Sequence, residues 1–133
     1  MTFRETLGVH LGAIQGRDLG TLMSTVAPDS LTLITANGRV VRTAAEFAGI
    51  YQSWFSSMSW TLDVSMVSIV EGPSLGVATL LLEYRDDQED GPTLERKGLL
   101  TLAFAHRAGA WEMVLAQNTP IRAQEPAEAE ADA

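Results

Sequence analysis

The stretch WEMVLAQNTPI, residues 111–121, carries the pattern on which the interpretation of the fold depends. Its first half alternates as a β-strand does, which places Trp111, Met113 and Leu115 on one side. Residues 117–119 then supply three hydrogen-bonding side chains in a row, and a proline follows them. Either the strand leaves the core at this point, or the core contains a place for something polar.

Three long strands are expected before this one. Residues 60–70 alternate between apolar and polar side chains, which is typical of a half-buried strand. Residues 75–84 are apolar on both faces, which favours a central strand, and residues 95–106 supply the next one. Since short connections join all four segments, we expect a run of consecutive antiparallel strands.

Three helical segments precede the strands. Thr2 and Glu5 have the spacing of a capping box, and apolar residues then recur every three or four positions. Asp18 can cap a short second helix. Thr43 and Glu46 repeat the capping-box spacing ahead of a third helical face that is strongly apolar.

A hairpin separates the second helix from the third. Residues 30–35 alternate as a strand, and Asn37 with Gly38 favours a tight turn into a short return strand. This order predicts an α+β domain over residues 1–122, in which helices cover one face of a curved antiparallel sheet. Residues 123–133 are acidic and poor in apolar side chains, so we expect them to form a disordered tail.

Composition excludes several classes of protein and site. The net charge is −8 and the basic residues are scattered, which argues against nucleic acid or an anionic membrane as a partner. There is no apolar run long enough to span a membrane. The absence of cysteine fits a cytoplasmic setting and excludes thiolate chemistry. With two histidines and no glycine-rich phosphate loop, we expect no metal and no cofactor.

The element order resembles a known family over nearly the whole chain, up to about Arg122. A helix, the stretch GRDLGTLMSTVAPDSLTLI, a hairpin, a helix and a meander ending in GAWEMVLAQNTPI are similar to the SnoaL-like branch of the nuclear transport factor 2-like superfamily. The phrase from Trp111 to Pro120 resembles the subgroup found beside enediyne and other polyketide biosynthetic pathways. The resemblance implies a cystatin-like cone in which the sheet wraps around the N-terminal helices, with a ligand pocket at its mouth and a homodimer packed through the sheet.

The relatives that this resemblance brings in include ketosteroid isomerase, polyketide cyclases, dehydratases and binding modules without catalysis, so the fold does not fix the function. By the resemblance, His10 falls where the isomerases place a tyrosine that donates a hydrogen bond to a developing oxyanion. A neutral histidine could donate or shuttle a proton there, or it could be satisfied by a backbone carbonyl at the seam between helix and sheet. The two carboxylates of the isomerases would fall near Ile34 and Thr101, where no acid exists.

Gln117 shares its side of the last strand with Trp111 and Met113, and we expect that side to face the cavity. Its amide could then fix a carbonyl or hydroxyl group of a ligand, with Thr119 beside it at the rim. Alternatively, the strand end emerges into solvent there. Asn118 is expected to point the other way, towards the surface or a dimer interface.

A group of aromatic and methionine side chains completes the predicted pocket. Aromatic residues at helical spacing usually belong to a core, but a partly hollow cone would also be lined by them and would suit a flat or apolar ligand. The candidate ligand-binding residues are His10, Tyr51, Trp54, Phe55, Trp60, Met66, Trp111, Met113, Gln117 and Thr119. Of the acidic strand residues, Asp63 is expected to face solvent or a second subunit, and Glu83 to turn inward.

Three functions follow from these patterns. The first is a pocket protein that binds a hydrophobic, polyketide-like metabolite. The second is a cyclase, dehydratase or isomerase that uses His10 as its proton-transfer group. The third is a dimerisation module with a filled core. A cavity of several hundred Å³ that touches both His10 and Gln117 would support the first two functions, and a solid core would support the third.

Overall fold

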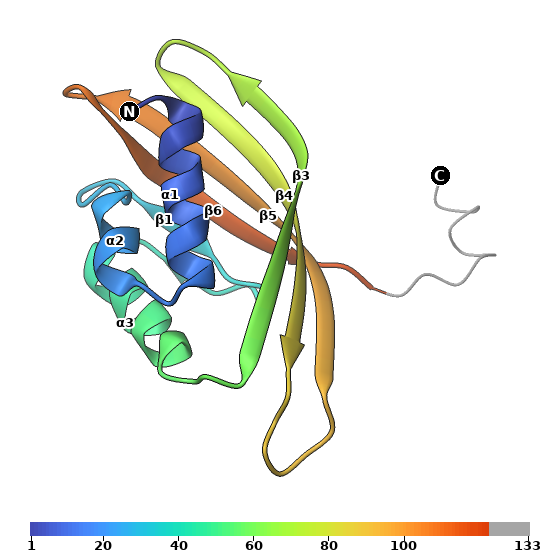
Figure 1. Cartoon of the computed structure of the whole chain (residues 1–133). Coiled ribbons are helices and arrows are strands. Elements are labelled where there is room, and N and C mark those ends of the chain that lie inside the picture. The colour runs from blue at the N-terminus through green and yellow to red at the C-terminus, as the bar shows by residue number, and fades with distance from the viewer. Residues whose placement is uncertain (123–133) are drawn as a thin grey trace.

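The computed structural model describes residues 1–122, so the predicted acidic tail lies outside the described residues (Figure 1). The elements are α1 (Phe3–Gln15), α2 (Leu19–Ser24), β1 (Thr32–Ile34), β2 (Val40–Val41), α3 (Ala44–Phe55), β3 (Trp60–Glu71), β4 (Leu75–Asp86), β5 (Leu94–Arg107) and β6 (Ala110–Pro120). The predicted α+β class is confirmed. None of the helices within residues 1–122 has the length and apolar character needed to cross a membrane.

Local signals set the helix boundaries. The Thr2 side chain accepts a hydrogen bond from the Glu5 N–H at 3.1 Å, and the Glu5 carboxylate accepts one from the Thr2 N–H at 2.9 Å. This is the capping box that the spacing predicted. Asp18 caps α2 and Thr43 caps α3 in the same way, each through the backbone N–H three residues later.

One six-stranded sheet, in the order β2-β1-β6-β5-β4-β3, bends around α1 without closing (Figure 1). Every neighbouring pair is antiparallel except β1 and β6, which are parallel. The expectation of a wholly antiparallel sheet was therefore wrong at this pair. No hairpin joins β1 to β6, so no tight turn fixes their relative direction.

The helices lie on one face of the sheet, called here the inner face, and no helix of the described chain covers the opposite, outer face (Figure 1). The space under α1 is filled. Phe3, Leu7 and Ile14 of α1 are buried against sheet residues such as Leu80 and Phe104. At Gly76, an added Cβ would lie 2.7 Å from the Phe3 ring, so α1 packs almost directly on the backbone of β4.

Two irregularities interrupt the strand pairing. Phe104 of β5 pairs with Met113 of β6, and Ala103 of β5 pairs with Leu115 of β6, so Val114 of β6 is an extra residue. In β3, the register shifts between Met66 and Ser68. Each is a β-bulge, and a bulge changes which side chains of its strand point to a given face. The bulge in β6 decides the composition of the candidate site.

Candidate functional site

His10 is a buried core residue. Its Nδ1 lies 2.8 Å from Oγ1 of Thr25, and that hydroxyl donates to the Leu22 carbonyl at 2.7 Å. Since the hydroxyl proton is already used, Nδ1 of His10 must be the donor, which assigns the proton of the neutral ring to Nδ1. The ring also meets Phe104 edge-on, with centroids 5.4 Å apart.

The environment of His10 keeps the ring uncharged. Only 1% of the residue is exposed, and burial lowers its pKa to about 4. Neither of the two hollows described below includes His10 in its lining. His10 is thus satisfied at the seam where α1 meets α2 and the sheet, as the alternative expected, but its partner is the Thr25 hydroxyl and not a backbone carbonyl.

The orientations expected for Gln117 and Asn118 were both wrong. Gln117 pairs with Thr101 and is exposed on the outer face, whereas Asn118 is half-buried on the inner face. The cause is the extra residue Val114, because counting alternate residues from Trp111 through an unbroken strand puts every later side chain on the opposite face. Thr119 follows Gln117 to the outer face, and His10 and Gln117 therefore lie on opposite sides of the sheet.

An inner cavity lies where α1, α3 and the sheet meet, and its volume is about 30 Å³. That is room for about one water molecule. The lining is apolar apart from two polar side chains, and it consists of Leu11, Ile14, Tyr51, Trp54, Leu62, Val64, Leu82, Leu100 and Asn118. Burial raises the pKa of Tyr51 to about 12, so its hydroxyl stays protonated and can donate a hydrogen bond at neutral pH.

The structure divides the predicted aromatic group between this cavity and the core. Tyr51 and Trp54 line the cavity. Trp60 is fully buried and stacks on Trp54, with the ring centroids 4.2 Å apart. The Arg17 guanidinium lies over the Trp60 ring, 3.9 Å from its centroid. Phe55 is also buried in the core.

The remaining predicted pocket residues lie away from the cavity. Met113 is fully buried. Near the start of β6, Trp111 packs between Phe3 and His106, with ring centroids 5.5 Å and 4.9 Å away, respectively. Met66 is 51% exposed on β3. The ten candidate residues are thus not brought together around one hollow. Sequence reasoning missed Leu11, Ile14 and Asn118, although the helical period of α1 could have indicated the first two.

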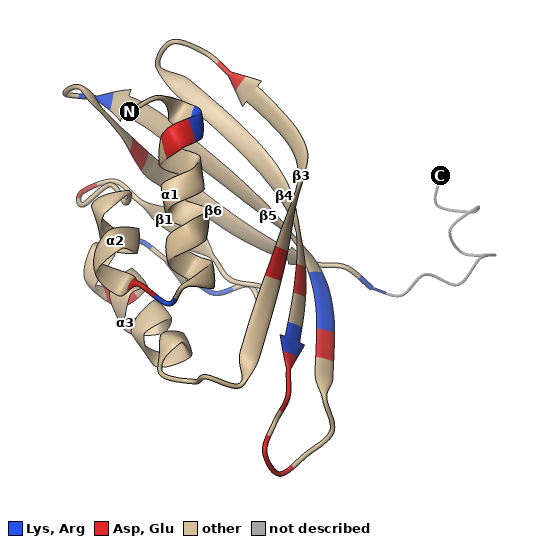
Figure 2. Cartoon of the chain, viewed as in Figure 1, with Lys and Arg blue, Asp and Glu red and all other residues tan. Residues whose placement is uncertain are grey.

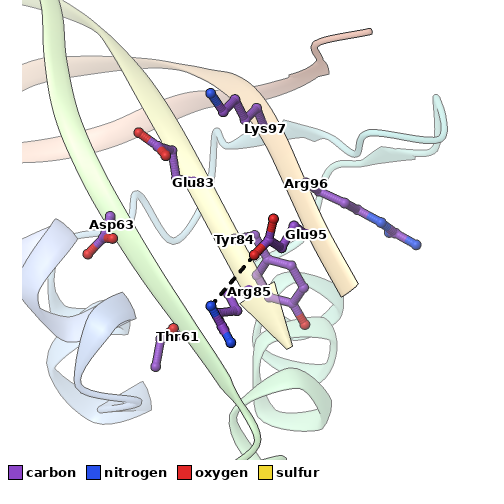
Figure 3. Close-up of a pocket in the computed structure, with 8 residues that line it drawn as sticks. All are labelled: Thr61, Asp63, Glu83, Tyr84, Arg85, Glu95, Arg96 and Lys97. Carbon is purple, nitrogen blue, oxygen red and sulfur yellow. Dashed lines mark ion pairs between the residues drawn. The ribbon is translucent and has the colours of Figure 1, made fainter. Parts of the chain in front are cut away.

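A second, larger hollow of about 440 Å³ lies at one end of β3, β4 and β5, is lined mainly by side chains of the outer face, and is open to solvent. Figure 3 shows its side chains on three neighbouring strands, and they are Thr61, Asp63, Glu83, Tyr84, Arg85, Glu95, Arg96 and Lys97. Glu83 was expected to turn inward, but it is exposed here and pairs across the strands with Asp63. A charged, open surface of this kind is unsuited to an apolar ligand, so the smaller inner cavity is the better candidate for one.

Comparison with known proteins identifies the family. A model of the SnoaL-like domain matches residues 4–118. Among solved structures, a protein from Thiobacillus denitrificans proposed to be a calcium/calmodulin-dependent protein kinase type II association domain has a TM-score of 0.77 at 19% identity, covering 91% of this chain and 96% of its own. A ketosteroid isomerase-like protein from Erwinia carotovora atroseptica has a TM-score of 0.75 at 14% identity, and the match covers 90% of this chain and 94% of that protein.

A third structure, a protein from Streptomyces avermitilis proposed to be a dehydratase of the NTF2-like family, has a TM-score of 0.73 at 13% identity and covers 89% of this chain and 93% of its own. Identities this low establish a shared fold only. No curated protein matches the chain. The family match spans most of the chain and agrees with the curved sheet and the N-terminal helices, and the chain therefore belongs to the SnoaL-like domain family.

Proposed function

We propose that this protein is a non-catalytic binding domain that takes a small, uncharged and largely apolar molecule at the inner cavity. SnoaL-like domains commonly bind small molecules or act as isomerases or dehydratases. The composition of the cavity lining carries the proposal. It contains a phenol and a carboxamide but no carboxylate and no imidazole, so it offers hydrogen bonds without an acid–base pair.

The two polar groups favour a ligand with one carbonyl or hydroxyl group. Among the described residues, neither the Tyr51 hydroxyl nor the Asn118 amide forms a hydrogen bond, and neither is sealed from solvent. A ligand oxygen could accept from either group, while the aliphatic walls contact the rest of the molecule. An ionised ligand would find no counter-charge in this lining and would pay a large desolvation cost.

The size of the cavity constrains how the ligand enters. The empty volume accommodates only a small group, so a larger molecule must displace side chains at the opening. Leu11 of α1 and Trp54 of α3 are half-buried and line the cavity, so they are candidates for this movement. A flat polyketide-like metabolite, which the resemblance to polyketide-associated members suggests, would take the space of the Trp54 ring. This ligand class and the cytoplasmic setting are both parts of the proposal.

The test is an NMR titration of ¹⁵N-labelled protein with 2-naphthol and 1-tetralone, which are small, uncharged and aromatic. We expect shifts centred on residues 51, 54 and 118. Asn118→Leu keeps the side-chain size but removes the hydrogen bond, and it should weaken binding roughly 5- to 10-fold, as the loss of about 1 kcal/mol predicts. Gln117→Leu is the matched control, because it makes the same change one residue earlier on the other face and should leave binding unchanged.

The acid–base enzyme using His10 gains no support from this geometry, since within residues 1–122 the ring bonds only the Thr25 hydroxyl and lines neither hollow. Shifts confined to residues 83–97 of the outer hollow, or equal losses for the two leucine variants, would contradict the proposal. Binding that is lost in His10→Leu but retained in Asn118→Leu would restore His10 as the ligand-binding group.

A further inference from the structure

The outer hollow differs from the inner cavity in its chemistry, and the two share no lining residue. Figure 2 shows that acidic and basic residues gather at this end of β3, β4 and β5. Six of the eight residues that line the outer hollow are charged, three of them acidic and three basic. Three of the nine basic residues of a chain with a net charge of −8 are therefore placed here. A hollow with both signs of charge is suited to a ligand that also carries both.

One row of side chains across these strands carries charges that are not paired within the described chain. Asp63 of β3 lies directly opposite Glu83 of β4, which in turn lies opposite Lys97 of β5. Because directly opposed residues share a face of the sheet, all three side chains point to the same side (Figure 3). Within residues 1–122 none of the three takes part in an ion pair, whereas Arg85 in the next row pairs with Glu95 at 3.6 Å. The row therefore presents two carboxylates and one ammonium group to the hollow.

The juxtaposition of Asp63 and Glu83 is unfavourable in the ligand-free protein. Like charges directly opposite each other destabilise a sheet, and sequences depart from such local rules mainly at functional sites. A positive group placed between the two carboxylates would turn their repulsion into attraction. Within residues 1–122 no three histidine, cysteine or acidic side chains are grouped as metal ligands would be. An organic ammonium group therefore suits this position better than a metal ion.

We propose that the outer hollow binds a small zwitterion of dipeptide length, with its ammonium group between Asp63 and Glu83 and its carboxylate at Lys97. The spacing of the strands sets this length. Neighbouring strands lie about 4.8 Å apart, so the midpoint between Asp63 and Glu83 is about 7 Å from Lys97 across the sheet. An extended chain of two residues spans about 7 Å, whereas a single amino acid spans about half of that.

The order of the charges disfavours ligands that carry only one sign. An anion bound at Lys97 would lie beside the carboxylate of Glu83, and a simple cation at the two carboxylates would be repelled by Lys97. A zwitterion meets an opposite charge at each of its ends. Arg96 also lines the hollow, but its side chain points away from Glu83 and Lys97 in Figure 3, so it has no part in the proposed contacts.

The test is an NMR titration of ¹⁵N-labelled protein with glycylglycine at neutral pH and low salt, where exposed charges are least screened. We expect saturable shifts centred on residues 61, 63, 83 and 97, with a dissociation constant in the millimolar range because the hollow is open to solvent. N-acetylglycylglycine lacks the ammonium group and glycylglycine amide lacks the carboxylate, so each should bind at least 5-fold more weakly. Glycine is too short to reach both ends and should also bind at least 5-fold more weakly.

Two variants test the contacts at each end of the ligand. Asp63→Asn relieves the repulsion with Glu83, so it should raise the urea midpoint of the ligand-free protein and yet weaken glycylglycine binding at least 5-fold. Lys97→Met should abolish the difference between glycylglycine and its amide, because the carboxylate then has no partner. Asp29→Asn and Arg42→Met are matched controls, because they neutralise exposed charges outside the hollow and should bind glycylglycine as the natural chain does.

The comparison of the four ligands needs no variant, so it decides the proposal even where a substitution impairs folding. Equal binding of glycylglycine and its amide would overturn the zwitterion and leave a simple cation contact at the two carboxylates. The absence of saturable shifts at tens of millimolar glycylglycine would remove the site altogether. Neither result bears on the inner cavity, because its lining residues are different and its probes are uncharged.

Discussion

Protonation of His10 should make the stability of this protein fall steeply in mild acid. The ring has a pKa of about 4 in the folded chain because it is buried, against an ordinary value of 6.5. Between these two values the unfolded chain binds a proton and the folded chain does not. Folding therefore becomes less favourable as the pH falls through 6.5 towards 4, and linkage gives a loss of about 2 kcal/mol between pH 7.5 and pH 5.

Urea denaturation at the two pH values measures this loss, and His10→Leu isolates its source. Leucine has a similar volume and does not titrate, and Thr25 keeps its hydrogen bond to the Leu22 carbonyl. The variant should lose about 2 kcal/mol less than the natural chain over the same pH interval, whatever its absolute stability. His106→Gln removes the exposed histidine and serves as the control. Equal losses in His10→Leu and the natural chain would refute the view that a buried neutral imidazole controls acid stability.

Two further changes test the packing that holds α1 in place. Gly76→Ala adds a methyl group 2.7 Å from the Phe3 ring and should destabilise the fold by about 1–3 kcal/mol in urea, whereas Gly49→Ala, with open space at its Cβ inside α3, should stabilise it by about 1 kcal/mol. Arg17→Lys keeps the charge but loses the planar fork that bonds the carbonyls of Ser57, at 3.0 Å, and Trp60, so we expect a loss of about 1–3 kcal/mol by the same assay. An unchanged urea midpoint in either destabilising variant would contradict the corresponding contact.

The features that sequence patterns predicted are those set by near neighbours in the chain. The capping box at Thr2 and the N-cap at Thr43 depend on a residue three positions away, and the turn after Asn37 depends on the glycine that follows it, which has a φ of 86°. The four long strands were also predicted from the sequence, because the alternation of apolar and polar side chains depends only on neighbouring residues. For the same reason the helical face of α1 identified the residues that pack on the sheet.

The features that sequence patterns missed depend on a partner far along the chain. The bulge at Val114 exists only relative to β5, and nothing in residues 111–121 marks Val114 as the extra residue. The parallel pairing of β1 with β6 likewise joins segments some eighty residues apart. The bond between His10 and Thr25 links two helices, so the sequence could identify the histidine but not the hydroxyl that satisfies it.

The extra residue Val114 assigns one carboxamide to each face of the sheet, because it shifts the alternation of β6 by one residue. Past the extra residue, Asn118 lines the inner cavity, and Gln117 lies on the outer face opposite Thr101. If the proposed function holds, Asn118→Leu should weaken ligand binding and Gln117→Leu should leave it unchanged. An unbroken β6 would exchange these effects, since Gln117 would then face the cavity. The same pair of variants, measured by titration, therefore tests the register of β6 as well as the role of its inner face.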